Sequence, residues 1–160
     1  MKHYVKGIAS MQLTGSYKFN HEQQAVWDVL MNPDAIAKAL PGVDELIPVE
    51  GEPDTWRADA KLGIATVRGK YSGIVKLSEQ NPPNQYRLTV SGSGQNSIID
   101  GTTLISLSYD ADNQQTILNW EADVQISGKL ASIGQRLIGA AANMMSKQFF
   151  QGLEKQLPKS

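Results

Sequence analysis

Side chains that commonly catalyse reactions or bind metals are scarce in this sequence. Its histidines are His3 and His21 and it has no cysteine, so neither a zinc or iron site nor thiol chemistry has a ligand set. His3 lies before the first predicted strand and His21 at a predicted helix start, so we expect both to be solvated surface groups. Serines are frequent, but none has a recognisable histidine base. We therefore expect no metal, no cofactor and no catalytic residue.

The acid–base candidates that remain are carboxylates and tyrosines. Asp59, Asp100 and Glu121 each alternate with apolar neighbours in a predicted strand, which places them on the solvent side. Catalysis by cavity shape together with Tyr71 or Tyr109 is an alternative that the sequence leaves open. Our prediction is a protein that is not an enzyme.

The composition is typical of a soluble, globular, single-domain protein. The chain has 160 residues, 41% of them hydrophobic and 19% charged, which is enough for one core. A formal net charge of -1 argues against nucleic-acid binding, which needs a basic surface. The N-terminal sequence lacks the apolar core of a secretory signal, and no apolar run of about 20 residues predicts a membrane span. We expect a cytoplasmic protein without an integral membrane segment, and peripheral association at the inner face of the membrane stays open.

The longest helical pattern, residues 128–157, is the element that must position any site. Its apolar residues recur at steps of three and four, which draws one stripe along a helix. They are Leu130, Ile133, Leu137, Ile138, Ala141, Met144, Met145, Phe149, Leu153 and Leu157. Polar and charged residues fall mostly between them, so we expect one buried and one solvated face.

Shorter elements precede this helix. Apolar and polar residues alternate over 11–19, which predicts a strand, and Asn20 with Gln23 has the spacing of a helix capping box. A second short helix is predicted to begin at the Asn-Pro pair 32–33 and to end at the Pro-Gly pair 41–42.

Alternation with period two then continues to residue 126, interrupted by turn sequences at 81–84 and 110–113. A weaker strand is predicted near 45–49. With the first strand, the pattern indicates an antiparallel sheet of about seven strands with one solvated face.

The fold follows because the apolar sheet face and the apolar helix stripe each need a cover. We predict an α+β fold of the helix-grip type, in which a curved antiparallel sheet wraps around the long C-terminal helix. Two short helices follow the first strand. Residues 1–10 would be an N-terminal lead-in and residues 11–157 a single domain.

Small residues are frequent on the predicted inner face of the sheet, and they predict a cavity. They are Ala58, Ala60, Gly69, Gly73, Gly92, Gly101 and Ala122, opposite Gly134, Gly139 and Ala140 to Ala142 of the helix. A close-packed core would instead alternate large and small side chains. Two alternatives stay open: the glycines serve only strand curvature, or Trp56, Tyr71 and Trp120 fill the space.

Several short motifs, in this order along the chain, carry a family resemblance. They are Ala25-Val26-Trp27, Asn32-Pro33, Leu40-Pro41-Gly42-Val43, Lys61-Leu62-Gly63, Val67-Arg68-Gly69-Lys70-Tyr71-Ser72-Gly73, Pro82-Pro83, Tyr86-Arg87-Leu88, Gly92-Ser93-Gly94, Gly128-Lys129-Leu130-Ala131 and Gly134-Gln135-Arg136-Leu137-Ile138. Together with the element order, they resemble the CoxG-like family of carbon monoxide dehydrogenase subunits. That family belongs to the SRPBCC superfamily, which has the START-like helix-grip fold. The resemblance covers about residues 11–155.

The resemblance implies binding of an elongated hydrophobic molecule, such as a lipid, an isoprenoid or a quinone-like compound, between sheet and helix. It also implies an accessory role beside a molybdenum hydroxylase of the carbon monoxide dehydrogenase type. We expect these residues to contact the ligand: Leu40, Trp56, Ala58, Ala60, Leu62, Tyr71, Leu88, Val90, Ile105, Trp120, Ala122, Leu137, Ala141, Met144 and Met145.

Two alternative functions remain. One is a maturation or recruitment factor that acts on such a dehydrogenase by contact alone, without a ligand. The other is a small cyclase-like or hydrolase-like enzyme acting on apolar substrates.

Overall fold

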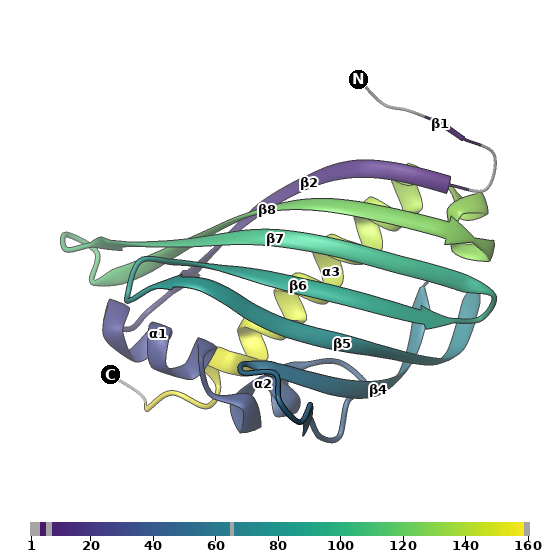
Figure 1. The fold of residues 1–160 in the computed structure, drawn as a ribbon. Coiled ribbons are helices and arrows are strands. Elements are labelled where there is room, and N and C mark those ends of the chain that lie inside the picture. The colour runs from purple at the N-terminus through teal and green to yellow at the C-terminus, as the bar shows by residue number, and fades with distance from the viewer. Residues whose placement is uncertain (1–3, 6–7, 65, 159–160) are drawn as a thin grey trace.

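The computed structural model describes residues 4–5, 8–64 and 66–158. In this part of the chain, eight strands form one antiparallel sheet with the order β1-β2-β8-β7-β6-β5-β4-β3 (Figure 1). The strands are β1 (Tyr4–Val5), β2 (Ile8–Phe19), β3 (Ile47–Pro48), β4 (Thr55–Ile64), β5 (Val67–Asn81), β6 (Gln85–Gly94), β7 (Ser97–Asp110) and β8 (Gln115–Gly128). The predicted α+β helix-grip fold is confirmed: β2 to β8 are the seven predicted strands, and β1 is a short addition.

The first long strand starts earlier than predicted. β2 begins at Ile8, and Ile8 to Ser10 pair with residues 125–127 of β8. Part of the predicted lead-in therefore belongs to the sheet, whereas His3 and the rest of residues 1–3 and 6–7 lie outside the described residues. Hydrogen bonds to the neighbouring strand hold residues 8–10 in the sheet. Local alternation in the sequence does not show this pairing.

The first short helix, α1 (Gln23–Leu30), begins without the predicted capping box. Its N-cap is Glu22, and no side chain caps it. The backbone N–H of Asn20 donates to Glu154 Oε2 at 2.8 Å, and its side-chain oxygen accepts from Gln115. Asn20 thus faces the C-terminal part of the chain and not the helix start, so the capping-box prediction was wrong.

The second short helix, α2 (Pro33–Ala39), begins as predicted. Asn32 accepts hydrogen bonds from the backbone N–H groups of Asp34 and Ala35, and Pro33 occupies the first helical position. The chain leaves the helix at Leu40 and turns through Gly42, whose φ of +74° favours glycine.

The predicted long helix is divided in two. A short 3-10 helix, η1 (Lys129–Ile133), precedes α3 (Gln135–Glu154), and Gly134 with φ +95° separates them. Gly128 also has a positive φ, and a Cβ there would lie 2.1 Å from the Asn96 carbonyl oxygen. The prediction of one continuous helix over 128–157 was therefore wrong, because the two glycines let the chain turn while the apolar spacing continues.

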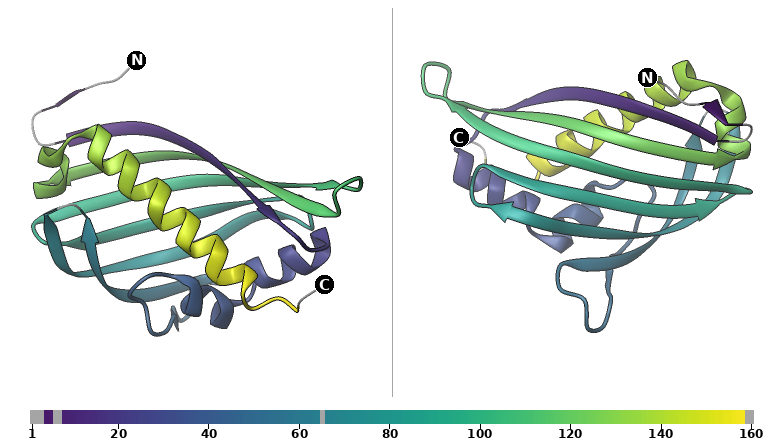
Figure 2. Two further views of the ribbon diagram at one scale, coloured as in Figure 1. Left: turned by 180° about the vertical axis from the view of Figure 1, so that it is seen from behind. Right: turned by 45° about the horizontal axis from the view of Figure 1, so that its top comes forward.

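α3 crosses the concave face of the curved sheet (Figure 2). Two groups of buried side chains lie beneath it. One surrounds Phe19, Leu118 and Leu153 beside α1 and α2. The other surrounds Ile126 and Leu130 beside η1.

Candidate functional site

An apolar cavity of about 390 Å³ lies between α3 and the sheet. We call it the α3 cavity. It is far larger than the voids of a close-packed interior, few of which exceed one water molecule. Among the described residues, its lining includes no charged side chain, and the lining side chains with a polar hydrogen are Tyr86, Thr103, Trp120 and Ser146. Such a space suits an uncharged hydrophobic molecule.

The cavity exists because α3 is anchored at its ends and not in its middle. The buried residues of α3 are Ile138 near its start and Phe150 and Leu153 near its end. Between them, the side chains that face the cavity include the small Ala141 and Ala142. The inner face of the sheet lies opposite without filling the gap.

Both ends of the cavity are closed by close packing. Beside α1, Phe150 packs against Tyr17 and Phe19, with ring centroids 5.7 and 6.3 Å apart. Gly152 allows α3 to approach α2, since a Cβ there would lie 3.1 Å from Ala39. At the other end, the fully buried Leu130 of η1 covers the sheet, and its backbone N–H donates to the Ser97 hydroxyl at 2.9 Å.

The large aromatic residues do not fill the cavity. The Trp120 indole lies against Gly15 of β2, where a Cβ would come within 2.5 Å of the ring. Trp56 is buried in the packed group beside α2. Tyr71 is buried in the group beside η1, and its hydroxyl donates to the Val67 carbonyl oxygen at 3.2 Å.

The inward glycines serve two purposes. Gly73 allows close strand approach, because a Cβ there would lie 2.6 Å from the Ser91 carbonyl oxygen. Gly101 lines the cavity, and a Cβ there would make only ordinary contacts, the nearest at 3.8 Å. Strand packing therefore explains Gly73, whereas at Gly101 the missing side chain enlarges the cavity.

Of the residues predicted to contact a ligand, nine line the α3 cavity. They are Leu40, Leu62, Leu88, Val90, Ile105, Trp120, Ala122, Ala141 and Met145.

Four others lie on the concave side but outside the cavity: Trp56, Ala58, Ala60 and Tyr71. They belong to the two strands beside the sheet edge. Alternation assigns a residue to a face of the sheet, but not to a position along that face.

Leu137 and Met144, by contrast, point away from the cavity. They are 52% and 63% exposed, whereas Ile138 is buried and Met145 lines the cavity. The prediction that both face inward was wrong, because each lies one residue, about 100°, around the helix from an inward side chain.

Sequence reasoning missed several lining residues, among them Tyr86 and Thr103. Alternation places both on the inner face, so a signal was present. Tyr86 is 2% exposed, and burial raises the pKa of its hydroxyl well above the usual value of 10. The group stays neutral at physiological pH.

A surface cleft lies next to the cavity, between α2, α3 and β4. Its rim contains the lysines Lys38, Lys61, Lys70 and Lys155 and the carboxylates Asp44 and Asp59. The cleft and the cavity share Leu40 and Pro41 in their linings. The segment that follows α2 therefore separates the cavity from this polar surface.

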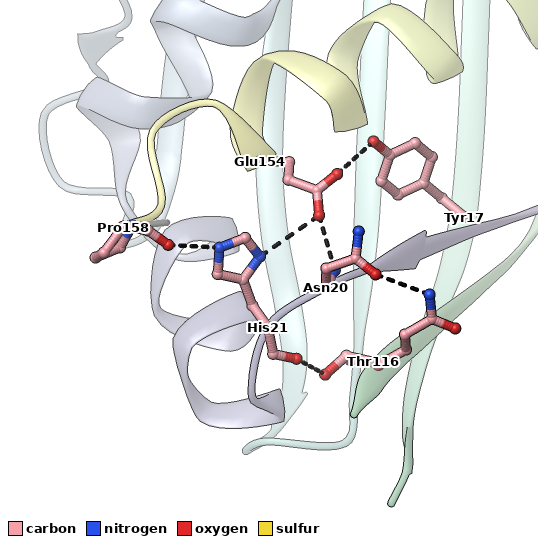
Figure 3. Close-up of polar contacts among 7 residues, drawn as sticks. Tyr17, Asn20, His21, Thr116, Glu154 and Pro158 are labelled. Carbon is pink, nitrogen blue, oxygen red and sulfur yellow. Dashed lines mark hydrogen bonds and ion pairs between the residues drawn. The ribbon is translucent and has the colours of Figure 1, made fainter. Parts of the chain in front are cut away.

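A polar network attaches the C-terminal end of α3 to the sheet (Figure 3). Glu154 accepts hydrogen bonds from the Tyr17 hydroxyl and the Asn20 backbone N–H, both at 2.8 Å. Its Oε2 lies 3.4 Å from His21 Nδ1, and His21 Nε2 donates to the Pro158 carbonyl oxygen at 2.7 Å. The His21 side chain is only 13% exposed, so the prediction of a solvated surface group was wrong.

The acid–base candidates lie away from the cavity. Asp59, Asp100 and Glu121 are exposed, as predicted, and Asp59 accepts a hydrogen bond from Ser72. Tyr109 is also exposed and donates to Glu22. In the described part of the chain, no group of three or more metal-binding side chains occurs.

Together, the curved sheet, the crossing helix and the apolar cavity between them define a START-like helix-grip protein. The chain matches the CoxG family, which is described as a carbon monoxide dehydrogenase subunit, over residues 15–158 and belongs to that family. A search of curated proteins gives no match. Among the described residues, no helix is long and apolar enough to cross a membrane.

Solved structures support the same fold. A conserved protein from Geobacillus kaustophilus is 30% identical with a TM-score of 0.85, and the match covers 91% of this chain and 94% of that one. A START superfamily protein from Mycobacterium smegmatis is 12% identical with a TM-score of 0.68, covering 91% and 95%. The Zhui aromatase/cyclase from Streptomyces sp. R1128 is 11% identical with a TM-score of 0.64, covering 92% and 93%. The last two show the fold alone.

Proposed function

We propose that this protein binds an elongated, uncharged hydrophobic molecule in the α3 cavity and catalyses no reaction on it. The observation that carries the proposal is the cavity itself, about 390 Å³ in volume and lined, as far as the structure describes the chain, by uncharged side chains. The ligand class is a lipid, an isoprenoid or a quinone-like compound. The two packed ends of α3 support the proposal, because they hold the helix in place over the α3 cavity.

Binding would be driven by removal of apolar ligand surface from water. A ligand that buries about 300 Å² of apolar surface gains roughly 7 kcal/mol before the costs of immobilisation are subtracted. The few polar groups of the lining would orient the ligand.

The family description favours a role beside a molybdenum hydroxylase of the carbon monoxide dehydrogenase type. We include this accessory role in the proposal, together with a cytoplasmic location and peripheral contact with the inner face of the membrane. The second candidate function is recruitment or maturation of such a dehydrogenase by contact alone. A third, less favoured candidate is catalysis on an apolar substrate, and one structural neighbour is an aromatase/cyclase by name.

Native mass spectrometry of protein purified without detergent tests the proposal. We expect a bound molecule, or uptake of one molecule per chain from a mixture of neutral lipids and quinones, and organic extraction then identifies its class. A ligand-free mass with no uptake would contradict the proposal. Recovery of a stoichiometric molybdenum hydroxylase by such ligand-free protein would favour the contact-only function.

A further inference from the structure

In the part of the chain that the structure describes, Tyr86 is the one tyrosine in the lining of the α3 cavity. It lies near the start of β6, where its ring packs edge-on against Trp27 of α1 with centroids 5.6 Å apart. Only 2% of the residue is exposed, and among the described residues its hydroxyl has no hydrogen-bond partner. The hydroxyl oxygen is not one of the fully buried atoms that lack a partner, so it keeps some accessible surface. A hydroxyl that lines an apolar cavity and has no protein partner is available to a ligand.

Thr103 places a second hydroxyl on the same inner face. Tyr86 pairs with Ile105 of β7, so Thr103, two residues from Ile105, is its diagonal neighbour on the concave side. The Thr103 hydroxyl likewise has no hydrogen-bond partner within the described part of the chain. Ser146, across the cavity on α3, differs because its hydroxyl donates to the Asn143 carbonyl oxygen at 3.0 Å.

The charge of the lining limits what these hydroxyls can bind. Among the described residues, no lysine, arginine or histidine lines the cavity, so an ionised carboxylate inside would lack a counter-charge. An ammonium group would also be unpaired, since no carboxylate of the described chain lines the cavity. A neutral carbonyl oxygen avoids both costs and accepts the hydrogen bond that a phenolic hydroxyl donates.

We propose that the Tyr86 hydroxyl, with Thr103 beside it, is the polar anchor of the α3 cavity and selects a ligand that has an uncharged carbonyl group at one end. The carbonyl lies beside α1, and the apolar remainder extends along the cavity toward Leu130 and Ile138. This inference rests on the proposed function, and it names the specificity-determining residue of that site.

The test compares two probes, tridecan-2-one and tridecane, which differ in one carbonyl group. Affinities are measured by displacement of the neutral fluorophore N-phenyl-1-naphthylamine from wild-type protein and from Tyr86→Phe. Since one neutral hydrogen bond contributes about a factor of five, the ketone-to-alkane affinity ratio should fall about fivefold in Tyr86→Phe, with alkane affinity unchanged. Thr103→Val should lower the ratio by a smaller factor. The control Tyr109→Phe, which alters an exposed tyrosine outside the cavity, should leave it unchanged.

Infrared spectroscopy gives a second readout, and its first measurement uses wild-type protein alone. The carbonyl stretch of ¹³C-labelled tridecan-2-one bound to wild-type protein should lie at the lower frequency of a hydrogen-bonded ketone. In Tyr86→Phe it should move toward its frequency in alkane solvent.

The outcomes separate the two proposals. If both probes bind and Tyr86→Phe leaves their ratio unchanged, or if the bound ketone shows no hydrogen-bonded carbonyl, this inference is overturned and ligand binding stands. If neither probe binds to wild-type protein, the proposed function fails and the inference fails with it.

Discussion

The ends and the middle of α3 belong to one amphipathic helix, yet they meet the sheet differently. Ile138, Phe150 and Leu153 are buried at the two ends, although Ile138 and Phe150 also border the cavity. Ala141 and Met145 have the same inward orientation but are only partly buried and face the cavity. The comparison shows that an apolar stripe indicates which face of a helix is covered, and not whether the space beneath it is filled.

Truncation of a side chain should therefore cost most at a packed end. Leu153 is 0% exposed, so Leu153→Ala should lower the free energy of unfolding by about 2–5 kcal/mol. Met145→Ala should cost less than about 1.5 kcal/mol, because the atoms removed already border a cavity. Chemical denaturation measures both. Equal losses would mean that the middle of α3 is packed as tightly as its end.

Filling the middle should abolish ligand uptake while the ends keep the fold intact. Ala141→Trp introduces a large ring into the cavity, and we expect at least a tenfold loss of affinity for a neutral fluorescent lipid analogue, equivalent to about 1.4 kcal/mol.

The matched control is Ala140→Trp, which changes the adjacent and exposed residue. It should bind the analogue like wild-type protein. Unchanged affinity in a folded Ala141→Trp protein would remove the middle of α3 from the site.

Alkaline pH should destabilise the folded protein through two tyrosines, Tyr86 in the cavity lining and Tyr17 at the C-terminal end of α3. Burial raises the pKa of Tyr86, whereas that of Tyr17 is raised first by burial and then by its hydrogen bond to Glu154 and the charge of that residue. Each folded-state pKa lies above the unfolded value of about 10, so the stabilisation is complete below pH 10 and is lost as the pH rises further.

Denaturation curves between pH 8 and pH 12 measure this loss. Tyr86→Phe and Tyr17→Phe should each reduce it, and Glu154→Gln should reduce only the contribution of Tyr17. An alkaline slope that none of these changes alters would contradict the assignment.

The smallest effect is expected on the outer face of α3. Met144→Gln changes a residue that is 63% exposed, so stability should change by less than about 0.5 kcal/mol. Affinity for the lipid analogue should also be unchanged. A clear loss of uptake in Met144→Gln would show that the outer face belongs to the site.

Much of the fold could be predicted because it depends on local patterns. Alternation identifies strands and their inner faces, and the Asn32-Pro33 pair correctly marks the start of α2. The helix break at Gly134 could not be predicted from the apolar spacing, since the spacing continues through η1 and does not report the glycine's φ.

The site could be predicted only in part. Leu137 and Ile138 are adjacent apolar residues, and only the position of the sheet decides which one faces inward. The burial of His21 depends on Glu154 and Pro158, more than 130 residues further along the chain. The unpaired hydroxyl of Tyr86 has no sequence signal, because a missing partner is a property of the packed structure.

The central claim is that the space beneath the middle of α3 holds a ligand. A crystal structure of the protein with a brominated long-chain ketone tests it most directly, because the anomalous scattering of bromine locates the chain. We expect bromine peaks between Ala141 and the inner face of β6 and β7. Bromine peaks confined to the outer surface, with Met145 and Phe149 occupying the cavity, would contradict the claim.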